Sequence, residues 1–125
     1  MQTILLPIQK KYCEKIFSGQ KFYEFRKSVP SKNIEKIIVY ESRGCGMAIG
    51  ELLIKGIISG SIEEIWQLTK NKAGIEYSEF IKYFKSCEVA FVYSILSYVK
   101  YNKPKSIDQY NLSRAPQNFV WIERK

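Results

Sequence analysis

Apolar residues are grouped in short runs along this chain, and the spacing within each run predicts a helix or a strand. The first run, TILLP at residues 3–7, predicts a short strand that Pro7 ends. Residues 8–19 predict an amphipathic helix that Gly19 ends, because their apolar positions recur at helical spacing. That stripe consists of Ile8, Tyr12, Cys13 and Ile16. Residues 21–27 alternate between the two faces of a second strand.

The middle of the chain predicts two more strands and two helices. Residues 34–42 form a third strand, and residues 47–59 form a long one that Gly50 bends or interrupts with a bulge. A helix follows at residues 62–70, opened by the capping-box spacing of Ser61 and Glu64. A second helix at residues 75–85 carries a regular apolar stripe, which predicts a buried face. The stripe consists of Tyr77, Phe80, Ile81 and Phe84.

The last third predicts two strands around a loop. Residues 88–101 are mostly apolar and predict a central strand, in which we expect Phe91 to be buried. Residues 103–112 predict a loop with one helical turn, and residues 118–125 a final strand in which Trp121 is buried. Together these elements indicate one α+β domain over residues 1–125. Long bent strands favour a small, partly closed β-barrel with about three helices.

The charge balance narrows the class of partner. Lysine and arginine outnumber the acidic residues 20 to 12, which gives a formal net charge of +8. This excess favours a polyanionic partner such as RNA or DNA, although the same balance also serves solubility alone. It is concentrated in residues 10–36 and 100–125, which share a surface if the two ends of the domain pair.

The absence of histidine excludes several kinds of site. Without it there is no Ser-His or Cys-His catalysis and little zinc chemistry, so we expect no metal and no cofactor. The cysteines Cys13, Cys45 and Cys87 lie too far apart for a CxxC pair and predict no disulfide framework. The start of the chain does not resemble a signal peptide and no run reaches membrane-spanning length, which predicts a cytoplasmic protein.

Three motifs have a structural and a functional interpretation. RGCGMAIG precedes a strand and is not a dinucleotide fingerprint; it predicts a hairpin turn whose Arg43 can also approach a ligand. The amides of Gln117 and Asn118 can bond base edges, or can complete a loop. Tyrosines along the chain, Tyr23 among them, can stack on bases, or can lie half-buried with the hydroxyl outside.

The segment GQKFYEFRK is unusual for its charged residues. Glu24 and Arg26 are neighbours on one strand face, and Lys21 stands at the entrance of the strand. The simplest interpretation is an exposed ion pair that contributes little stability. The alternative is that this face forms the wall of a binding site.

The order of these motifs resembles the ASCH family, whose fold is similar to the PUA domain. The resemblance rests on YCEKIFSGQKFYEFRK, IIVYES with GMAIGELLI, SIEEIWQLTKNKAGIEYSEFIKYF, EVAFVYSI and APQNFVWI, and is nearest to the stand-alone bacterial and phage members. It implies a cleft beside the first helix and second strand that binds RNA or a nucleobase. Lys21, Glu24 and Arg26 would point into that cleft. Ser42 with Arg43, and Gln117 with Asn118, would form its rim.

The resemblance also leaves an enzymatic alternative. One branch of the family hydrolyses acetylated cytidine, and there it implies a Lys, a Thr and a Glu as working residues. Lys21 matches the first, whereas Glu24 stands at the Thr position and Ala73 at the Glu position. Three hypotheses remain: a binding module for RNA or a modified nucleoside, an amidohydrolase in which Lys21 and Glu24 act, and a subunit that binds another protein. The oligomeric state stays open.

Overall fold

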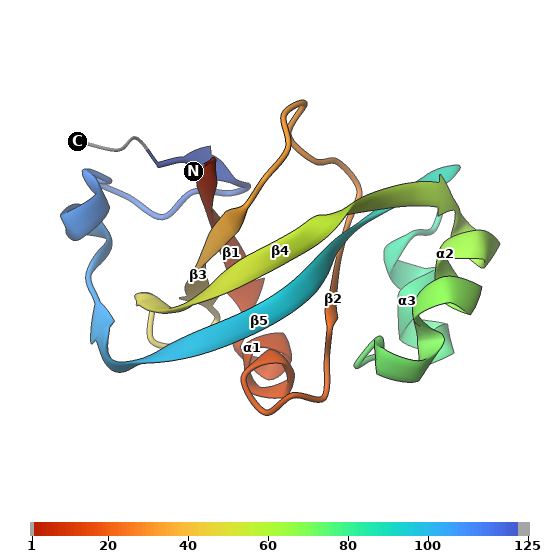
Figure 1. The fold of residues 1–125 in the computed structure, drawn as a ribbon, viewed down its shortest axis with the longest axis horizontal. Coiled ribbons are helices and arrows are strands. Elements are labelled where there is room, and N and C mark those ends of the chain that lie inside the picture. The colour runs from red at the N-terminus through yellow and green to blue at the C-terminus, as the bar shows by residue number, and fades with distance from the viewer. Residues whose placement is uncertain (1, 123–125) are drawn as a thin grey trace.

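A computed structural model, which describes residues 2–122, shows one six-stranded sheet with three α-helices beside it (Figure 1). The strands follow the spatial order β2-β5-β4-β3-β1-β6. The elements are β1 (Thr3–Gln9), α1 (Lys10–Ile16), β2 (Tyr23–Arg26), β3 (Lys36–Ser42), β4 (Ala48–Ser61), α2 (Ile62–Thr69), α3 (Tyr77–Tyr83), β5 (Val89–Lys105) and β6 (Val120–Trp121). Short 3₁₀ turns lie at Lys70–Lys72 and Ile107–Tyr110.

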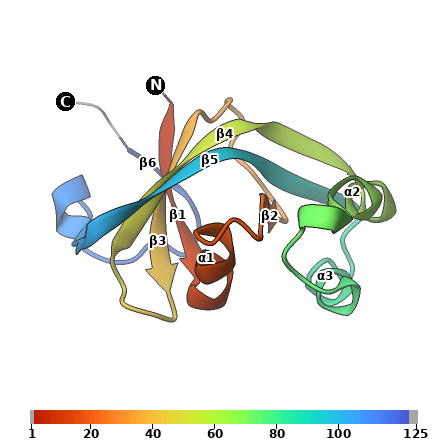
Figure 2. The ribbon, with the colours of Figure 1, turned by 60° about the horizontal axis from the view of Figure 1, so that its bottom comes forward.

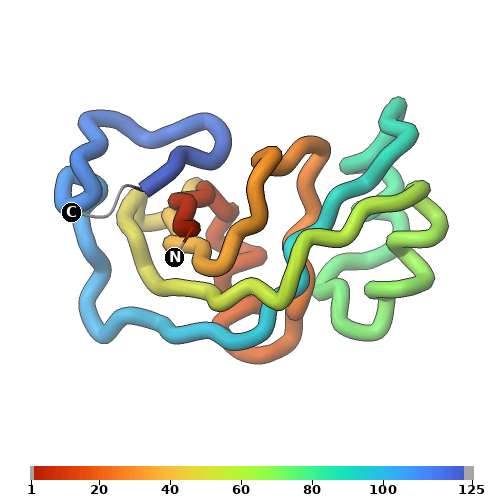
Figure 3. Tube along the Cα trace, turned by 45° about the horizontal axis from the view of Figure 1, so that its top comes forward, coloured from red at the N-terminus to blue at the C-terminus, as the bar shows by residue number. Residues whose placement is uncertain are grey.

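The sheet is mixed and strongly curved. β1 runs parallel to β3, and every other neighbouring pair is antiparallel. β4 and β5 form a long ribbon that carries α2 and α3 at one end (Figure 2). Figure 3 shows the C-terminal segment passing around the other end and returning to the N-terminal strand, where Ile4 pairs with Trp121. Within residues 2–122 the strands do not close into a full barrel, which agrees with the predicted partly closed α+β fold.

Two apolar clusters hold the helices against the sheet. The larger lies under α1, where Cys13 and Ile16 pack against the inner strands. The smaller lies under α2 and α3, where Phe80 and Phe84 contact Phe25 of β2 edge to face. Because Phe25 belongs to β2, the second cluster also fixes the strand that carries Glu24 and Arg26.

Several predicted details are confirmed. The capping box at the start of α2 is present, with the Ser61 hydroxyl accepting from the Glu64 N–H. The register of β4 shifts between Ala48 and Gly50, as expected for a bulge at the glycine. The helical turn in the C-terminal loop is the one at Ile107–Tyr110.

Other predictions are wrong, each for a physical reason. Pro7 does not end β1, which continues to Gln9 in its pairing with β3. On the other side β6 pairs only with Ile4 and Leu5, so no described strand there needs a backbone N–H from the proline. Ile81 is 39% exposed because α3 covers the end of the ribbon with one side only. Trp121 is 37% exposed because β6 is an outer strand of two residues. Tyr77 is exposed and Phe91 is half-buried. Residues 123–125 of the predicted last strand lie outside the described residues.

No helix within residues 2–122 has both the length and the apolar composition needed to span a membrane.

Candidate functional site

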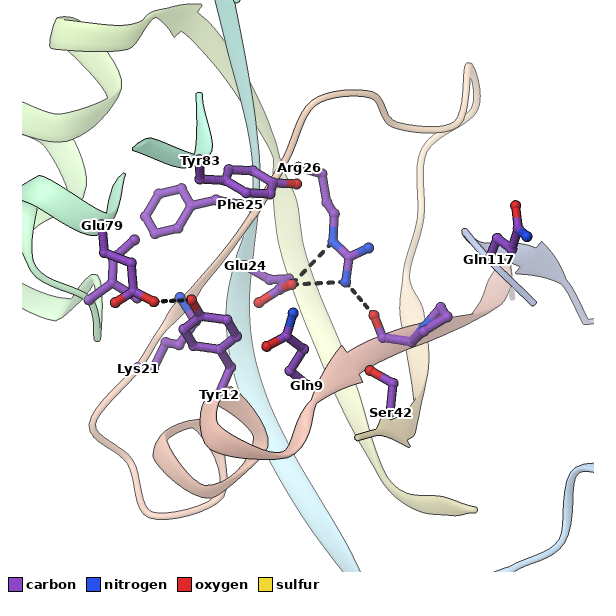
Figure 4. A pocket seen from close by; sticks show the side chains of 12 residues that line it. Gln9, Tyr12, Lys21, Glu24, Phe25, Arg26, Ser42, Glu79, Tyr83 and Gln117 are labelled. Carbon is purple, nitrogen blue, oxygen red and sulfur yellow. Dashed lines mark hydrogen bonds and ion pairs between the residues drawn. The ribbon is translucent and has the colours of Figure 1, made fainter. Parts of the chain in front are cut away.

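A cavity of about 240 Å³ lies where β1, α1, β2 and α3 meet (Figure 4). Its wall combines charged, amide, hydroxyl and aromatic side chains, as small-molecule sites do. The lining residues are Pro7, Gln9, Tyr12, Lys21, Glu24, Phe25, Arg26, Ser42, Ile75, Glu79, Tyr83 and Gln117.

Lys21 is buried at this cavity, with 2% of its surface exposed. After α1 the chain turns at Gly19, whose φ of +80° lies in the left-handed region, and the Lys21 N–H then donates to the Lys15 carbonyl at 3.1 Å. The Lys21 ammonium donates to the carbonyl oxygen of Ala73 at 2.8 Å and lies 4.6 Å from the ring centroid of Phe25. The side chain is therefore held by a carbonyl and an aromatic face, with no carboxylate in an ion pair with it among the described residues.

The surroundings of Lys21 change its acidity. Burial lowers the pKa of the ammonium from 10.5 to about 8, because desolvation disfavours the charged form. The negative charge of Glu24 opposes this shift, and the positive charges of Lys15 and Arg26 add to it. A fraction of Lys21 is consequently a neutral amine near neutral pH, which is rare for a lysine.

Glu24 and Arg26 form the opposite part of the wall. They are two residues apart on β2 and so share one face of the strand. Arg26 donates to a single oxygen of Glu24, from Nε at 3.1 Å and from Nη2 at 3.0 Å, and Nη2 also bonds the carbonyl of Pro7. The pair joins β2 to β1, and it leaves Oε1 of Glu24 without a hydrogen bond from the described residues.

A third polar group joins α1 to α3 across the cavity. The Tyr12 hydroxyl donates to Glu79 (Figure 4), and the Lys11 ammonium donates to the same carboxylate oxygen at 2.9 Å. These hydrogen bonds lower the pKa of Glu79. Glu79 is thus an ionised group with its charge already partly compensated.

The structure brings together most of the predicted site residues. Lys21, Glu24, Arg26, Ser42 and Gln117 all line the cavity, although they come from three separate parts of the chain. Figure 4 shows Gln117 at one side of it, on the C-terminal segment.

Three predicted residues do not line this cavity. Tyr23 is absent from the lining and packs against the second apolar cluster. Arg43 faces an adjoining hollow, and Asn118 is exposed. The observed cavity therefore includes fewer of the predicted rim residues than the sequence indicates.

Sequence analysis missed Gln9, Tyr12, Glu79 and Tyr83. On α3, Glu79 and Tyr83 are four residues apart, which places them on one helical face beside the buried stripe, and Ile75 lines the cavity from just before the helix. That spacing was visible in the sequence, but nothing in it showed which cavity the face meets.

No group of three His, Cys, Asp or Glu side chains within residues 2–122 is arranged to hold a metal ion. The lining of the cavity offers an amine, two carboxylates, a guanidinium, amides and hydroxyls.

Comparison with known proteins places this fold in a family. A family model described as the ASCH domain matches residues 6–106. The ASCH protein of Zymomonas mobilis has a similar solved structure, with a TM-score of 0.87 and 21% identity over 98% of this chain and 88% of that one. A point mutant of that protein gives a TM-score of 0.89 at 20% identity, over 99% and 92%. At these identities the likeness shows the fold.

More distant similarities are also found. The N-terminal domain of Staphylothermus marinus McrB has a TM-score of 0.56 and 17% identity, over 94% of this chain and 86% of that one. Among curated proteins of Ureaplasma parvum, ATP synthase subunit alpha is 27% identical and large ribosomal subunit protein uL22 is 23% identical, each over 98% of this chain. The chain spans 15% and 40% of the lengths of these two relatives.

Proposed function

The chain belongs to the ASCH domain family, and we propose that its cavity binds a nucleobase, presented by RNA or by a modified nucleoside. One observation carries the proposal: Lys21 and Glu24 are only 2% and 5% exposed, and both line the cavity. Burying these charges costs free energy. Lys21 and Glu24 belong to neither apolar cluster described above, and they do not form an ion pair with each other. Buried charged groups in a concave site are typical of ligand binding.

The polar groups suit the edge of a base. Glu24 Oε1 can accept from an exocyclic amine, as a carboxylate accepts from cytosine. The Lys21 ammonium has three N–H donors and uses one on Ala73, so it can donate to a ring carbonyl or nitrogen.

The size and the aromatic walls fit as well. The cavity of about 240 Å³ is smaller than the roughly 300–1,000 Å³ of drug-sized sites, which favours a single base. The rings of Tyr12, Phe25 and Tyr83 offer aromatic surface of the kind that contacts bases. The net charge of +8 would attract a polyanion to this protein.

Isothermal titration calorimetry with the four ribonucleosides and N4-acetylcytidine tests this proposal. A nucleoside should bind, and Glu24→Gln should weaken it about tenfold or more, since a good base-edge contact contributes about 1–3 kcal/mol. The control Glu88→Gln removes an exposed carboxylate that does not line the cavity and should change nothing. Equal nucleoside affinities for Glu24→Gln and Glu88→Gln would indicate that the nucleoside binds outside the cavity.

A second candidate function is amide hydrolysis, favoured by the lowered pKa of Lys21 at about 8. At neutral pH about a tenth of Lys21 would be neutral and able to take a proton from water. The water oxygen would then add to the amide carbon, the C–N bond would break, and the proton would pass to the leaving nitrogen. Glu79 is the weaker base, because the hydrogen bonds from Tyr12 and Lys11 stabilise its charged form.

This second candidate has its own assay. Hydrolysis of N4-acetylcytidine to cytidine and acetate changes the ultraviolet spectrum of the nucleoside. Turnover that rises with pH toward 8 and disappears in folded Lys21→Met would establish the hydrolase. Binding of the nucleoside without turnover would contradict the hydrolase and support the binding function.

A further inference from the structure

A second hollow adjoins the cavity and carries unpaired positive charge. It is lined by Gln9, Lys10, Lys11, Glu14 and Arg43. Gln9 lines both spaces, and Arg43 directly follows Ser42, which lines the cavity. The two spaces are therefore neighbours at the junction of β1 with α1 and at the end of β3.

The positive side chains of this hollow differ in whether they form ion pairs. Lys11 is engaged by Glu79, whereas neither Lys10 nor Arg43 forms an ion pair or a side-chain hydrogen bond with any residue that the structure describes. Glu14 is the acidic residue in the lining, so the lining carries three positive charges against one negative. Free cations beside a polar cavity fit an anion on the same ligand.

The position of Arg43 is fixed by its turn. Its φ of +55° lies in the left-handed region, where few residues other than glycine are found. The turn is closed by Glu41, whose carboxylate accepts from the Cys45 N–H at 2.9 Å and whose carbonyl accepts from the Gly46 N–H at 3.1 Å. The carboxylate of Glu41 is thus occupied by the turn, and Arg43 is presented by a defined backbone.

We propose that this hollow binds a phosphate ester of the same ligand whose base occupies the cavity, an inference that rests on the proposed function. Lys10 and Arg43 would contact the phosphate oxygens. The ribose would lie between them and the base, beside the amide of Gln9, which can bond its hydroxyls. The ligand class is then a nucleotide, either a free monophosphate or one unit of a phosphodiester chain.

Calorimetry with cytidine, cytidine 5′-monophosphate, cytidine 3′-monophosphate and a trinucleotide with central cytidine tests this subsite. One of the phosphorylated ligands should bind the wild-type protein at least tenfold more tightly than cytidine. The double variant Lys10→Gln/Arg43→Gln should lose that advantage and keep its affinity for cytidine. The control Lys55→Gln/Lys100→Gln removes two exposed charges that line neither space, and should keep the advantage.

The outcomes separate the two proposals. Equal affinity for cytidine and all three phosphorylated ligands would overturn the phosphate subsite while leaving the base cavity intact. If the control Lys55→Gln/Lys100→Gln lost the affinity advantage of the phosphorylated ligands to the same extent, net charge alone would explain that advantage. This result would also overturn the subsite. Phosphorylated ligands that depend on Lys10 and Arg43 but not on Glu24 would support the subsite and contradict the base cavity, and no binding at all would overturn both.

The same ligands distinguish the source of the phosphate. A trinucleotide that keeps the full advantage indicates a chain, and its affinity should fall with salt more steeply for the wild type than for Lys10→Gln/Arg43→Gln. The slopes of log K against log salt should differ by about 0.7 for each phosphate that the variant no longer neutralises. An advantage confined to a monophosphate indicates a free nucleotide.

Discussion

The ammonium of Lys21 and the backbone carbonyl of Ala73 form a hydrogen bond of 2.8 Å between the start of β2 and the segment that precedes α3. The stem of Lys21 lies against the next residue, Gly74, whose φ is +73°. A Cβ at Gly74 would lie 2.5 Å from the Cβ of Lys21. The helical segment thus closes over Lys21 only because position 74 has no side chain.

Gly74→Ala should destabilise the protein through this close approach. The left-handed backbone alone costs about 1–2 kcal/mol for a residue with a Cβ, and the overlap with Lys21 adds to it. The control is Gly56→Ala, whose added Cβ meets nothing within 4 Å. Urea denaturation of both variants measures the difference, and a loss for Gly74→Ala no larger than that for Gly56→Ala would contradict the packing described.

The stability of the protein should depend on pH through Lys21. Its pKa is about 8 in the folded state and 10.5 ordinarily, so between these values the unfolded chain binds more protons. Unfolding free energy should therefore rise with pH across this window, as the buried ammonium loses its charge. The full effect of a shift of this size is about 3 kcal/mol.

Lys21→Met isolates this contribution, because tyrosines and other groups titrate in the same range in both proteins. Relative to Lys21→Met, the wild type should gain stability between pH 7.5 and pH 10 in urea melts at each pH. A difference between the two proteins that stays constant over this window would show that Lys21 keeps an ordinary pKa.

Phe84→Ala should cost about 3–5 kcal/mol of unfolding free energy, because Phe84 is 2% exposed and its removal leaves a cavity under α3. Ile81→Ala is the control on the same helix, and should cost less than half as much because Ile81 is 39% exposed. Similar losses for the two variants would mean that the face of α3 toward the sheet is assigned wrongly.

Single-stranded RNA should bind at low salt and weaken steeply as salt rises, since the net charge of +8 favours contact with phosphates. Fluorescence anisotropy with a labelled oligoribonucleotide measures both the affinity and its salt dependence. Absence of binding at low ionic strength would restrict the proposed ligand to a free nucleoside or nucleotide.

Local patterns predicted much of this fold. The alternation of residues 21–27 places Glu24 and Arg26 on one face, and both line the cavity, although Phe25 between them lines it as well. The start of α2 also follows a local signal, the capping box of Ser61 and Glu64. These features depend on neighbours in the chain, which a sequence displays directly.

The rest of the site depends on contacts between distant residues. Tyr12 meets Glu79 only because α1 and α3 face each other across β2, an arrangement that no local pattern contains. The exposure of Ile81 likewise reflects how little of α3 the ribbon covers, since its spacing alone indicates a buried position.

Two-dimensional ¹H–¹⁵N NMR during titration with the ribonucleosides tests the central claim, that the cavity beside Lys21 and Glu24 is the binding site. We predict that the shifted backbone signals will belong to β2, to the start of α1 and to Ala73 and Gly74, and that the shifts will disappear in Lys21→Met while its other signals stay in place. Shifts confined to other surfaces, or shifts that persist unchanged in Lys21→Met, would contradict the account.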